Sequence, residues 1–155
     1  MFYRKKRISN VISRRVGHHF LDPFNEQFTC WEEIAVYTAL MDGSAQYIIG
    51  NYLRSSFLPF RDLAKFLLKD EADHVNFGFS RIGDYYRSNP KLMKQLLKKW
   101  FPLAFGNFGS ANSEYDRLKL KYGVTQRSNE DTRKSYLLMV TKRLKNLKVP
   151  LPTTR

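Results

Sequence analysis

The segment that decides the fold lies at residues 70–78 and reads Asp70-Glu71-Ala72-Asp73-His74-Val75-Asn76-Phe77-Gly78. Apolar residues on both sides of it recur at helical spacing, which predicts a helix from about Pro59 to Arg87. On a helix, Glu71 and His74 project from one face about one turn apart, close enough to bind one metal ion together. This spacing alone is weak evidence, because a histidine beside a glutamate more often forms an ordinary hydrogen bond.

A second helix is expected just before this one. Apolar residues at helical spacing lead from a start signal at Asp22-Pro23 to about Tyr52, and a Ser-Ser and Pro turn at residues 54–59 follows. We therefore expect residues 30–52 and 60–87 to form an antiparallel helical hairpin.

The hairpin indicates which carboxylate lies opposite Glu71. If the turn is centred near residue 56, Glu71 lies 15 residues after it and Asp42 lies 14 residues before it. Glu32 and Glu33 are displaced by roughly 12 Å or more along the axis, too far to share a metal ion with Glu71. Asp42 also shares its side with small residues that leave room for a site, namely Ala35, Thr38, Ala39 and Ala45.

The candidate metal ligands are therefore Asp42, Glu71 and His74, and the hairpin at 22–88 would hold half of a two-metal site. This Glu-x-x-His unit is the one that di-iron carboxylate bundles use, and oxygen ligands with imidazole suit iron or manganese. The alternative is that Asp42 is a partly exposed side chain without a ligand role.

The rest of the chain also indicates helices. Ser88-Asn89-Pro90 opens a third helix, which Pro102 is expected to end or kink. A short helix is expected at 114–122, and Ser128 is expected to cap a last helix. No segment indicates a strand, so the fold class is all-α, and residues 1–155 are expected to form a single domain.

Charge is distributed unevenly over the 155 residues, whose net charge is +13. Residues 1–21 carry six Lys and Arg and no acid, residues 22–84 carry ten acids and five bases, and residues 85–155 carry four acids and sixteen bases. The chain is thus a basic N-terminal segment (1–21), an acidic hairpin region, and basic C-terminal helices (89–155). A basic excess raises the prospect of a nucleic-acid or anionic partner.

The single cysteine, Cys30, excludes an intrachain disulfide framework and a cysteine-rich zinc site. It favours a reducing compartment, so we expect a cytoplasmic protein. The apolar stretches fall short of the ~18 residues that cross a bilayer, so no membrane role is expected.

Residues 30–150 resemble the phenylacetic acid catabolic family, specifically the C-terminal half of its epoxidase catalytic subunit. The resemblance rests on the carboxylate at 42, on residues 70–74 leading into Phe77-Gly78-Phe79, and on the stretches Lys99-Trp100-Phe101-Pro102, Phe105-Gly106-Asn107-Phe108-Gly109 and Asn129-Glu130-Asp131-Thr132-Arg133. It implies a ferritin-like bundle with a non-haem di-iron centre that activates O₂ and forms an epoxide on the ring of an aromatic acyl-CoA such as phenylacetyl-CoA. It assigns metal-ligand roles to Asp42, Glu71 and His74 and no other catalytic or cofactor-binding residues.

The resemblance also implies partners. A complete member supplies a Glu and another Glu-x-x-His from an N-terminal helix pair, which this sequence lacks; His18 and His19 have no Glu three residues before them and are interpreted as solvated or capping residues. The chain could be a fragment or split subunit completed by an N-terminal-half subunit, a half-bundle completed by a second copy, or a degenerate relative without metal. A reductase would supply electrons.

Three functions therefore stay open. The first is a component of an aromatic acyl-CoA oxygenase. The second is a ferritin-like iron-oxidising protein whose site assembles at a homodimer interface. The third is a metal-free basic helical binding or scaffolding protein, whose binding would depend strongly on salt. Nucleic acid is not an expected partner.

Overall fold

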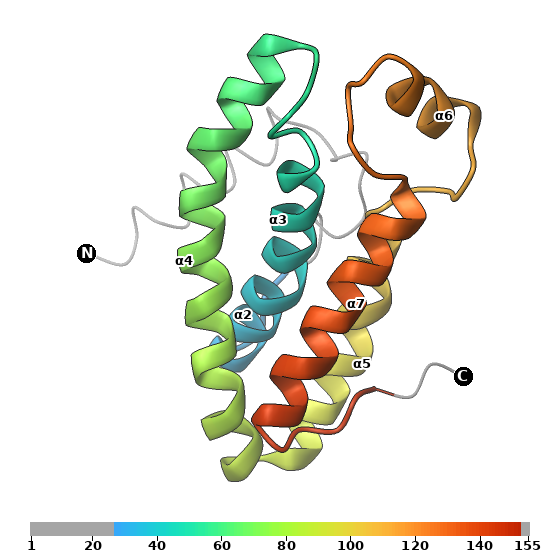
Figure 1. The fold of residues 1–155 in the computed structure, drawn as a ribbon. Coiled ribbons are helices and arrows are strands. Elements are labelled where there is room, and N and C mark those ends of the chain that lie inside the picture. Colours follow the sequence, from blue (N-terminus) through green and yellow to red (C-terminus); the bar gives the residue numbers. More distant parts are fainter. Residues whose placement is uncertain (1–26, 153–155) are drawn as a thin grey trace.

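The computed structural model describes residues 27–152, in which helices and loops form an open bundle and no strand occurs (Figure 1). The all-α prediction is confirmed, and the arrangement is consistent with a ferritin-like bundle. Within the described residues every helix is too short or too polar to span a bilayer. The basic segment 1–21, with His18 and His19, lies outside the described residues, as do Asp22 and Pro23.

The predicted hairpin is present. Three helical segments follow one another as one rod: α2 (Trp31–Tyr37), the π-helical turn η2 (Thr38–Asp42) and α3 (Gly43–Gly50). A loop leads into the long helix α4 (Leu58–Ser88), which runs antiparallel to the rod and packs against all three segments (Figure 1).

The start of the first helix differs from the expectation. Residues 27–30 are not helical, and Cys30 is extended, with φ −155° and ψ 169°. The carboxylate of Glu33 accepts hydrogen bonds from the backbone N–H and the hydroxyl of Thr29, at 2.8 and 2.7 Å. This contact holds the preceding chain outside the helix, so the helix begins at Trp31.

The third helix, α5 (Pro90–Gly106), starts as predicted. The Asn89 side chain accepts a hydrogen bond from the backbone N–H of Leu92 at 3.1 Å. The helix does not end at Pro102 but continues to Gly106. Pro102 is exposed, so its ring meets solvent rather than the core.

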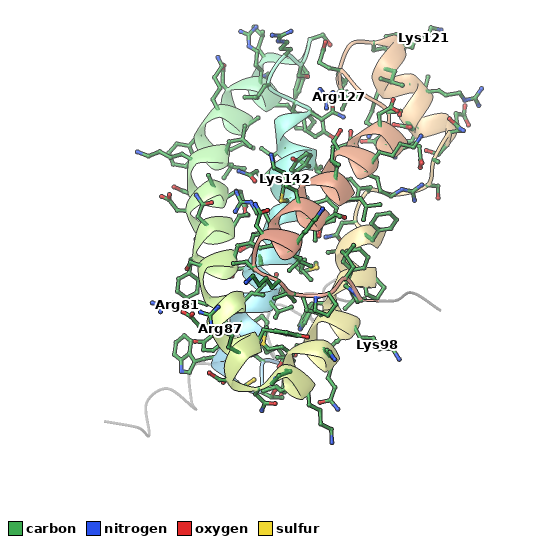
Figure 2. The ribbon with its side chains drawn as sticks, turned by 60° about the horizontal axis from the view of Figure 1, so that its bottom comes forward. Arg81, Arg87, Lys98, Lys121, Arg127 and Lys142 are labelled. Carbon is green, nitrogen blue, oxygen red and sulfur yellow. The ribbon has the colours of Figure 1, made fainter. Side chains whose placement is uncertain are left out.

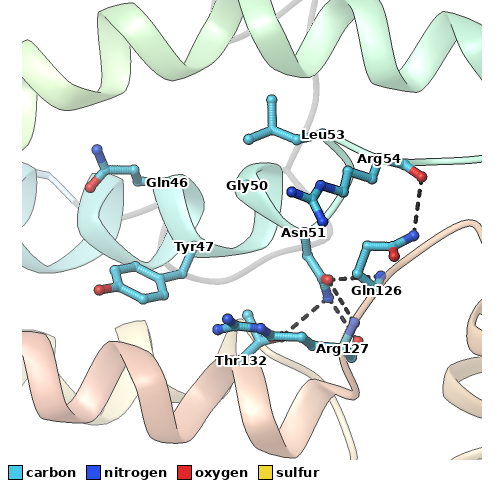
Figure 3. A pocket seen from close by; sticks show the side chains of 9 residues that line it. All are labelled: Gln46, Tyr47, Gly50, Asn51, Leu53, Arg54, Gln126, Arg127 and Thr132. Carbon is cyan, nitrogen blue, oxygen red and sulfur yellow. Dashed lines mark hydrogen bonds between the residues drawn. The ribbon is translucent and has the colours of Figure 1, made fainter.

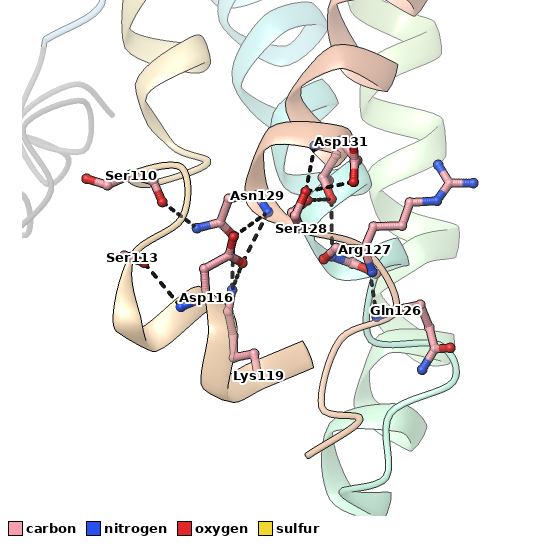
Figure 4. Close-up of polar contacts among 11 residues, drawn as sticks. Ser110, Ser113, Asp116, Lys119, Gln126, Arg127, Ser128, Asn129 and Asp131 are labelled. Atoms are coloured by element: carbon pink, nitrogen blue, oxygen red, sulfur yellow. Dashed lines mark hydrogen bonds and ion pairs between the residues drawn. The ribbon is translucent and has the colours of Figure 1, made fainter. Parts of the chain in front are cut away.

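The C-terminal part contains α6 (Glu114–Lys121) and α7 (Asn129–Asn146), each capped by a serine, Ser113 and Ser128 respectively. Figure 4 shows how the two helices are joined: buried Asp116 accepts the backbone N–H of Asn129 on both carboxylate oxygens at 3.1 Å. Lys119 donates to the side chain of Asn129 at 3.0 Å. Helix α7 then packs against α3.

The core lies between the rod, α4, α5 and α7, and its largest fully buried side chains include Trp100, Tyr136, Leu40, Ile82 and Met93. The Tyr136 hydroxyl donates to the carbonyl of Leu40 at 3.0 Å. The apolar stripe expected on α4 is buried only in its second half: Val75 and Ile82 are in the core, whereas Leu63 is 52% exposed. One flank of the hairpin therefore carries apolar side chains without a covering helix among residues 27–152.

Candidate metal centre

The three side chains singled out from the sequence converge on the outer flank of the hairpin. Asp42 is the last residue of η2, and Glu71 and His74 lie one turn apart on α4. One ligand atom from each lies within 4.8 Å of the others, and His74 Nδ1 is 3.5 Å from Asp42 Oδ2. No other group of three or more His, Cys, Asp or Glu within residues 27–152 has this geometry.

The π-helical turn contributes to this placement. In η2 the hydrogen bonds skip one residue more than in an α-helix, so the residues that follow are rotated relative to an uninterrupted helix. Such turns occur frequently at functional sites. Sequence reasoning missed it, because Thr38-Ala39-Leu40-Met41-Asp42 carries no signal that separates a π-turn from an α-turn.

Gly78 sets the distance between α4 and the rod. A Cβ atom at this position would lie 2.4 Å from the backbone nitrogen of Ala39 and 2.6 Å from the carbonyl oxygen of Ala35. Only glycine permits this approach. Because Gly78 is one turn beyond His74, the close approach fixes α4 beside η2 at the level of the candidate ligands.

The two carboxylates are held in an environment that disfavours their charges. Burial and then the charge of Glu71 raise the pKa of Asp42 to about 6, although His74 lowers it. Burial also raises the pKa of Glu71, with His74 opposing this shift. Burial, followed by the charges of Asp42 and Glu71, raises the pKa of the neighbouring Tyr37.

The same carboxylates fit a cation. Glu71 Oε2 is buried and has no hydrogen-bond partner in the described structure, a state that costs free energy unless an ion or a donor reaches it. Asp42 is 19% exposed, whereas the imidazole of His74 is 59% exposed and open to a partner. Two carboxylates and an imidazole are ligands that suit iron or manganese, although they make up only half of a two-metal set.

Glu33, which the hairpin geometry excluded from this site, belongs to a separate buried network. Its carboxylate accepts hydrogen bonds from Lys99 at 3.0 Å and from the Trp100 indole at 3.1 Å, besides those from Thr29. Burial alone would raise its pKa, but these bonds outweigh that effect and hold the pKa at about 2. Lys99 of α5 therefore takes part in an internal contact of the bundle.

Exposed apolar side chains lie before and after the candidate ligands along the hairpin. A hollow of about 220 Å³ between α3 and α4 is lined by Ile49, Tyr52, Phe60, Leu63, Ala64 and Leu67. Further along α4, Phe77 is exposed, and Trp31 is exposed on α2. Phe79, in contrast, lies in the core under the guanidinium of Arg143.

The basic residues do not gather at this site. Figure 2 shows Arg81, Arg87, Lys98, Lys121, Arg127 and Lys142 spread over several helices and connecting loops. These six residues therefore do not form one continuous basic stripe of the kind that follows a nucleic-acid backbone.

Comparison with known proteins gives a distant relationship to an oxygenase. No family model matches the chain. Benzoyl-CoA oxygenase component B of Aromatoleum evansii is 28% identical over 90 residues, which cover 56% of this chain and 19% of that protein. The chain thus spans about a fifth of the length of this curated relative. Membership of the phenylacetic acid catabolic family stays a prediction.

Proposed function

We propose that this chain contributes half of a di-iron centre to an oxygenase that acts on an aromatic acyl-CoA. The observation that carries the proposal is the convergence of Asp42, Glu71 and His74 within 4.8 Å, with a Glu71 oxygen buried and unpartnered. The distant relationship to a benzoyl-CoA oxygenase component supports the reaction class. Ring epoxidation of the phenylacetyl-CoA type is the specific reaction that we propose.

The protein residues would have distinct roles. Asp42 and Glu71 would bind iron through carboxylate oxygens, and His74 would bind through an imidazole nitrogen. When bound, iron would supply the reductive activation of O₂, with electrons from a separate reductase. Leu67, four residues before Glu71, and Phe77, three residues after His74, would help to exclude water from an apolar ring.

The site requires a second helix pair. Di-iron carboxylate bundles take one carboxylate from each of two helices and one Glu-x-x-His from each of two others. This chain supplies one member of each kind, with an aspartate in place of the usual glutamate. We propose that an N-terminal-half subunit or a second copy supplies the rest.

Anaerobic titration with Fe(II), followed by metal analysis and native mass measurement, tests the metal site. Asp42→Asn, Glu71→Gln and His74→Ala should each lower iron affinity by at least about tenfold. Asp73→Asn is the matched control, because Asp73 is an exposed carboxylate in the same turn of α4. Equal iron binding by all four variants and the parent chain, measured on the associated species that binds iron, would overturn the proposal.

Oxygen consumption separates the candidate functions. With a reductase and the completing helix pair present, benzoyl-CoA or phenylacetyl-CoA should accelerate O₂ uptake and yield an oxygenated ring. Uptake driven by Fe(II) alone and indifferent to acyl-CoA would instead identify a ferritin-like iron-oxidising protein. A chain that binds no iron under any of these conditions would be a degenerate relative or scaffold.

A further inference from the structure

A furrow runs along the junction of α3 and α7, on a different part of the molecule from the metal ligands. It consists of two adjoining hollows of about 590 and 600 Å³ that share Tyr47 and Arg127. Figure 3 shows the first hollow between α3 and the start of α7, with Arg54 and Arg127 on its two sides. Its walls come from α3 and α7, which pack together, and from the loops that follow α3 and precede α7.

The furrow is lined by cations and by no carboxylate. Its charged residues are Arg54, Arg127, Lys142 and Arg143. None of these four forms an ion pair with an acid within residues 27–152. The guanidinium of Arg127 donates to the hydroxyl of Ser135 at 3.3 Å, and that of Arg143 donates to the side-chain oxygen of Asn76 at 3.0 Å. This is the charge pattern of a surface that meets an anionic partner.

The local backbone does not suit a phosphate group. Phosphate sites at a helix start use free backbone N–H groups. Here the side chain of Asn51 already accepts the N–H groups of Gln126 and Arg127, at 3.0 and 2.9 Å (Figure 3). The hydroxyl of Ser128 accepts the N–H of Asp131 at 3.0 Å.

The cations are also spread too far for one small anion. Arg127 and Lys142 are separated by 15 residues, nearly all in α7, or roughly 22 Å at the helical rise. Between them lies an apolar segment, in which Leu138 is 71% exposed and Met139 and Tyr47 line the furrow. An elongated partner with carboxylates near both ends and an apolar side chain between them matches this pattern.

We propose that this furrow docks an acidic, amphipathic segment of a partner protein. Carboxylates of the segment pair with Arg54 and Arg127 at one end and with Lys142 and Arg143 at the other, while an apolar side chain covers Leu138. Arginine guanidinium groups are suited to such contacts because their planar donors match carboxylates in pairs.

The test uses a synthetic helical peptide of glutamates and leucines on opposite faces as the probe, with the full chain. The test variant is Arg54→Gln/Arg127→Gln/Lys142→Gln, and it should bind the peptide at least about tenfold more weakly than the parent chain. The control variant is Lys91→Gln/Lys98→Gln/Lys121→Gln, which loses the same charge at exposed sites elsewhere. Its affinity for the peptide should fall much less. Arg127→Gln leaves the Asn51 contact intact, because Asn51 binds the backbone of residue 127. Circular dichroism and urea unfolding show whether both variants remain folded.

A second variant tests the apolar contact. Leu138→Ala should weaken binding of the amphipathic peptide at high salt and leave binding of a glutamate-only peptide unchanged. Equal losses for the two charge variants would show diffuse attraction to a basic protein and overturn the proposal. Inorganic pyrophosphate that binds the furrow more tightly than the peptide would also overturn it in favour of a phosphate-bearing ligand.

Discussion

Asp42 lowers the stability of the metal-free chain at neutral pH, and it is also a candidate metal ligand. Its pKa of about 6 in the metal-free chain lies above the usual value of 3.8, because the carboxyl is buried and lies beside Glu71. Between about pH 4 and 6 the native chain therefore binds more protons at this site than the unfolded chain does. The contribution of Asp42 to the free energy of unfolding accordingly falls as the pH rises through this interval.

Replacing Asp42 with Asn should stabilise the metal-free chain at pH 7. The neutral amide avoids the cost of a buried charge, so we expect a gain of about 1–3 kcal/mol that shrinks toward zero near pH 4. Urea unfolding at a series of pH values measures it, with the exposed Asp73→Asn as control. The same variant should lose iron binding, and a loss of stability at pH 7 would contradict this account of Asp42.

Gly78 is the second residue with a sharp prediction. In Gly78→Ala the new methyl group would meet the backbone of Ala39 and Ala35 at distances that require the helices to move apart. We expect a loss of about 3 kcal/mol or more in the free energy of unfolding, measured by urea denaturation. Gly106→Ala is the control: no heavy atom lies within 4 Å of its Cβ position, so its stability should change by less than about 1 kcal/mol.

Sequence reasoning reached Asp42, Glu71 and His74 because equal distance from a turn is a local property of a hairpin. It could not assign Glu33 a role, since its partners Lys99 and Trp100 are 66 and 67 residues away and meet it only in the folded bundle. The ligand role of the three converging residues stays a prediction.

At the scale of elements, the sequence predicted the helices and their caps well, because caps and periodicity are local signals. The hairpin, the Asn89 and Ser128 caps and the short helix after Ser113 are all present. The π-turn was not predictable, because no local signal separates it from an α-turn. Pro102 was expected to end or kink α5, and the helix continues past it with the exposed ring toward solvent.

The joint between α6 and α7 yields an element-scale prediction. Asp116→Ala would remove the acceptor of the Asn129 N–H and leave the half-buried Lys119 without its carboxylate (Figure 4). We expect a loss of about 2–3 kcal/mol and faster hydrogen exchange confined to residues 113–129. Asp62→Ala, which removes an exposed ion pair, should change stability by less than about 1 kcal/mol. Uniform exchange across the bundle would contradict a local role for Asp116.

At the scale of the whole molecule, the bundle has two unlike flanks. The rod and α4 present candidate metal ligands among exposed apolar residues, whereas the junction of α3 and α7 presents cations around one apolar segment. Sequence charge counts showed that residues 22–84 are acidic and that residues 85–155 are basic. They could not show that cations of α7 lie beside α3, because this depends on how α7 packs.

The exposed flank of the hairpin predicts that iron binding and association are coupled. Exposing apolar side chains to water costs free energy, and so does burying carboxylates without partners. A second helix pair would relieve both costs, because it would cover the apolar side chains and complete the metal site. We expect the monomer to bind iron weakly or not at all, and the iron-loaded species to be a dimer or heteromer by native mass measurement.

Leu63→Glu should prevent this association while leaving all three candidate ligands in place. Leu138→Glu, which adds the same charge to an exposed leucine on the other flank, should leave it intact. A monodisperse monomer that holds two iron ions tightly would show that the flank needs no partner. Full metal content after His74→Ala would show that His74 is not a ligand.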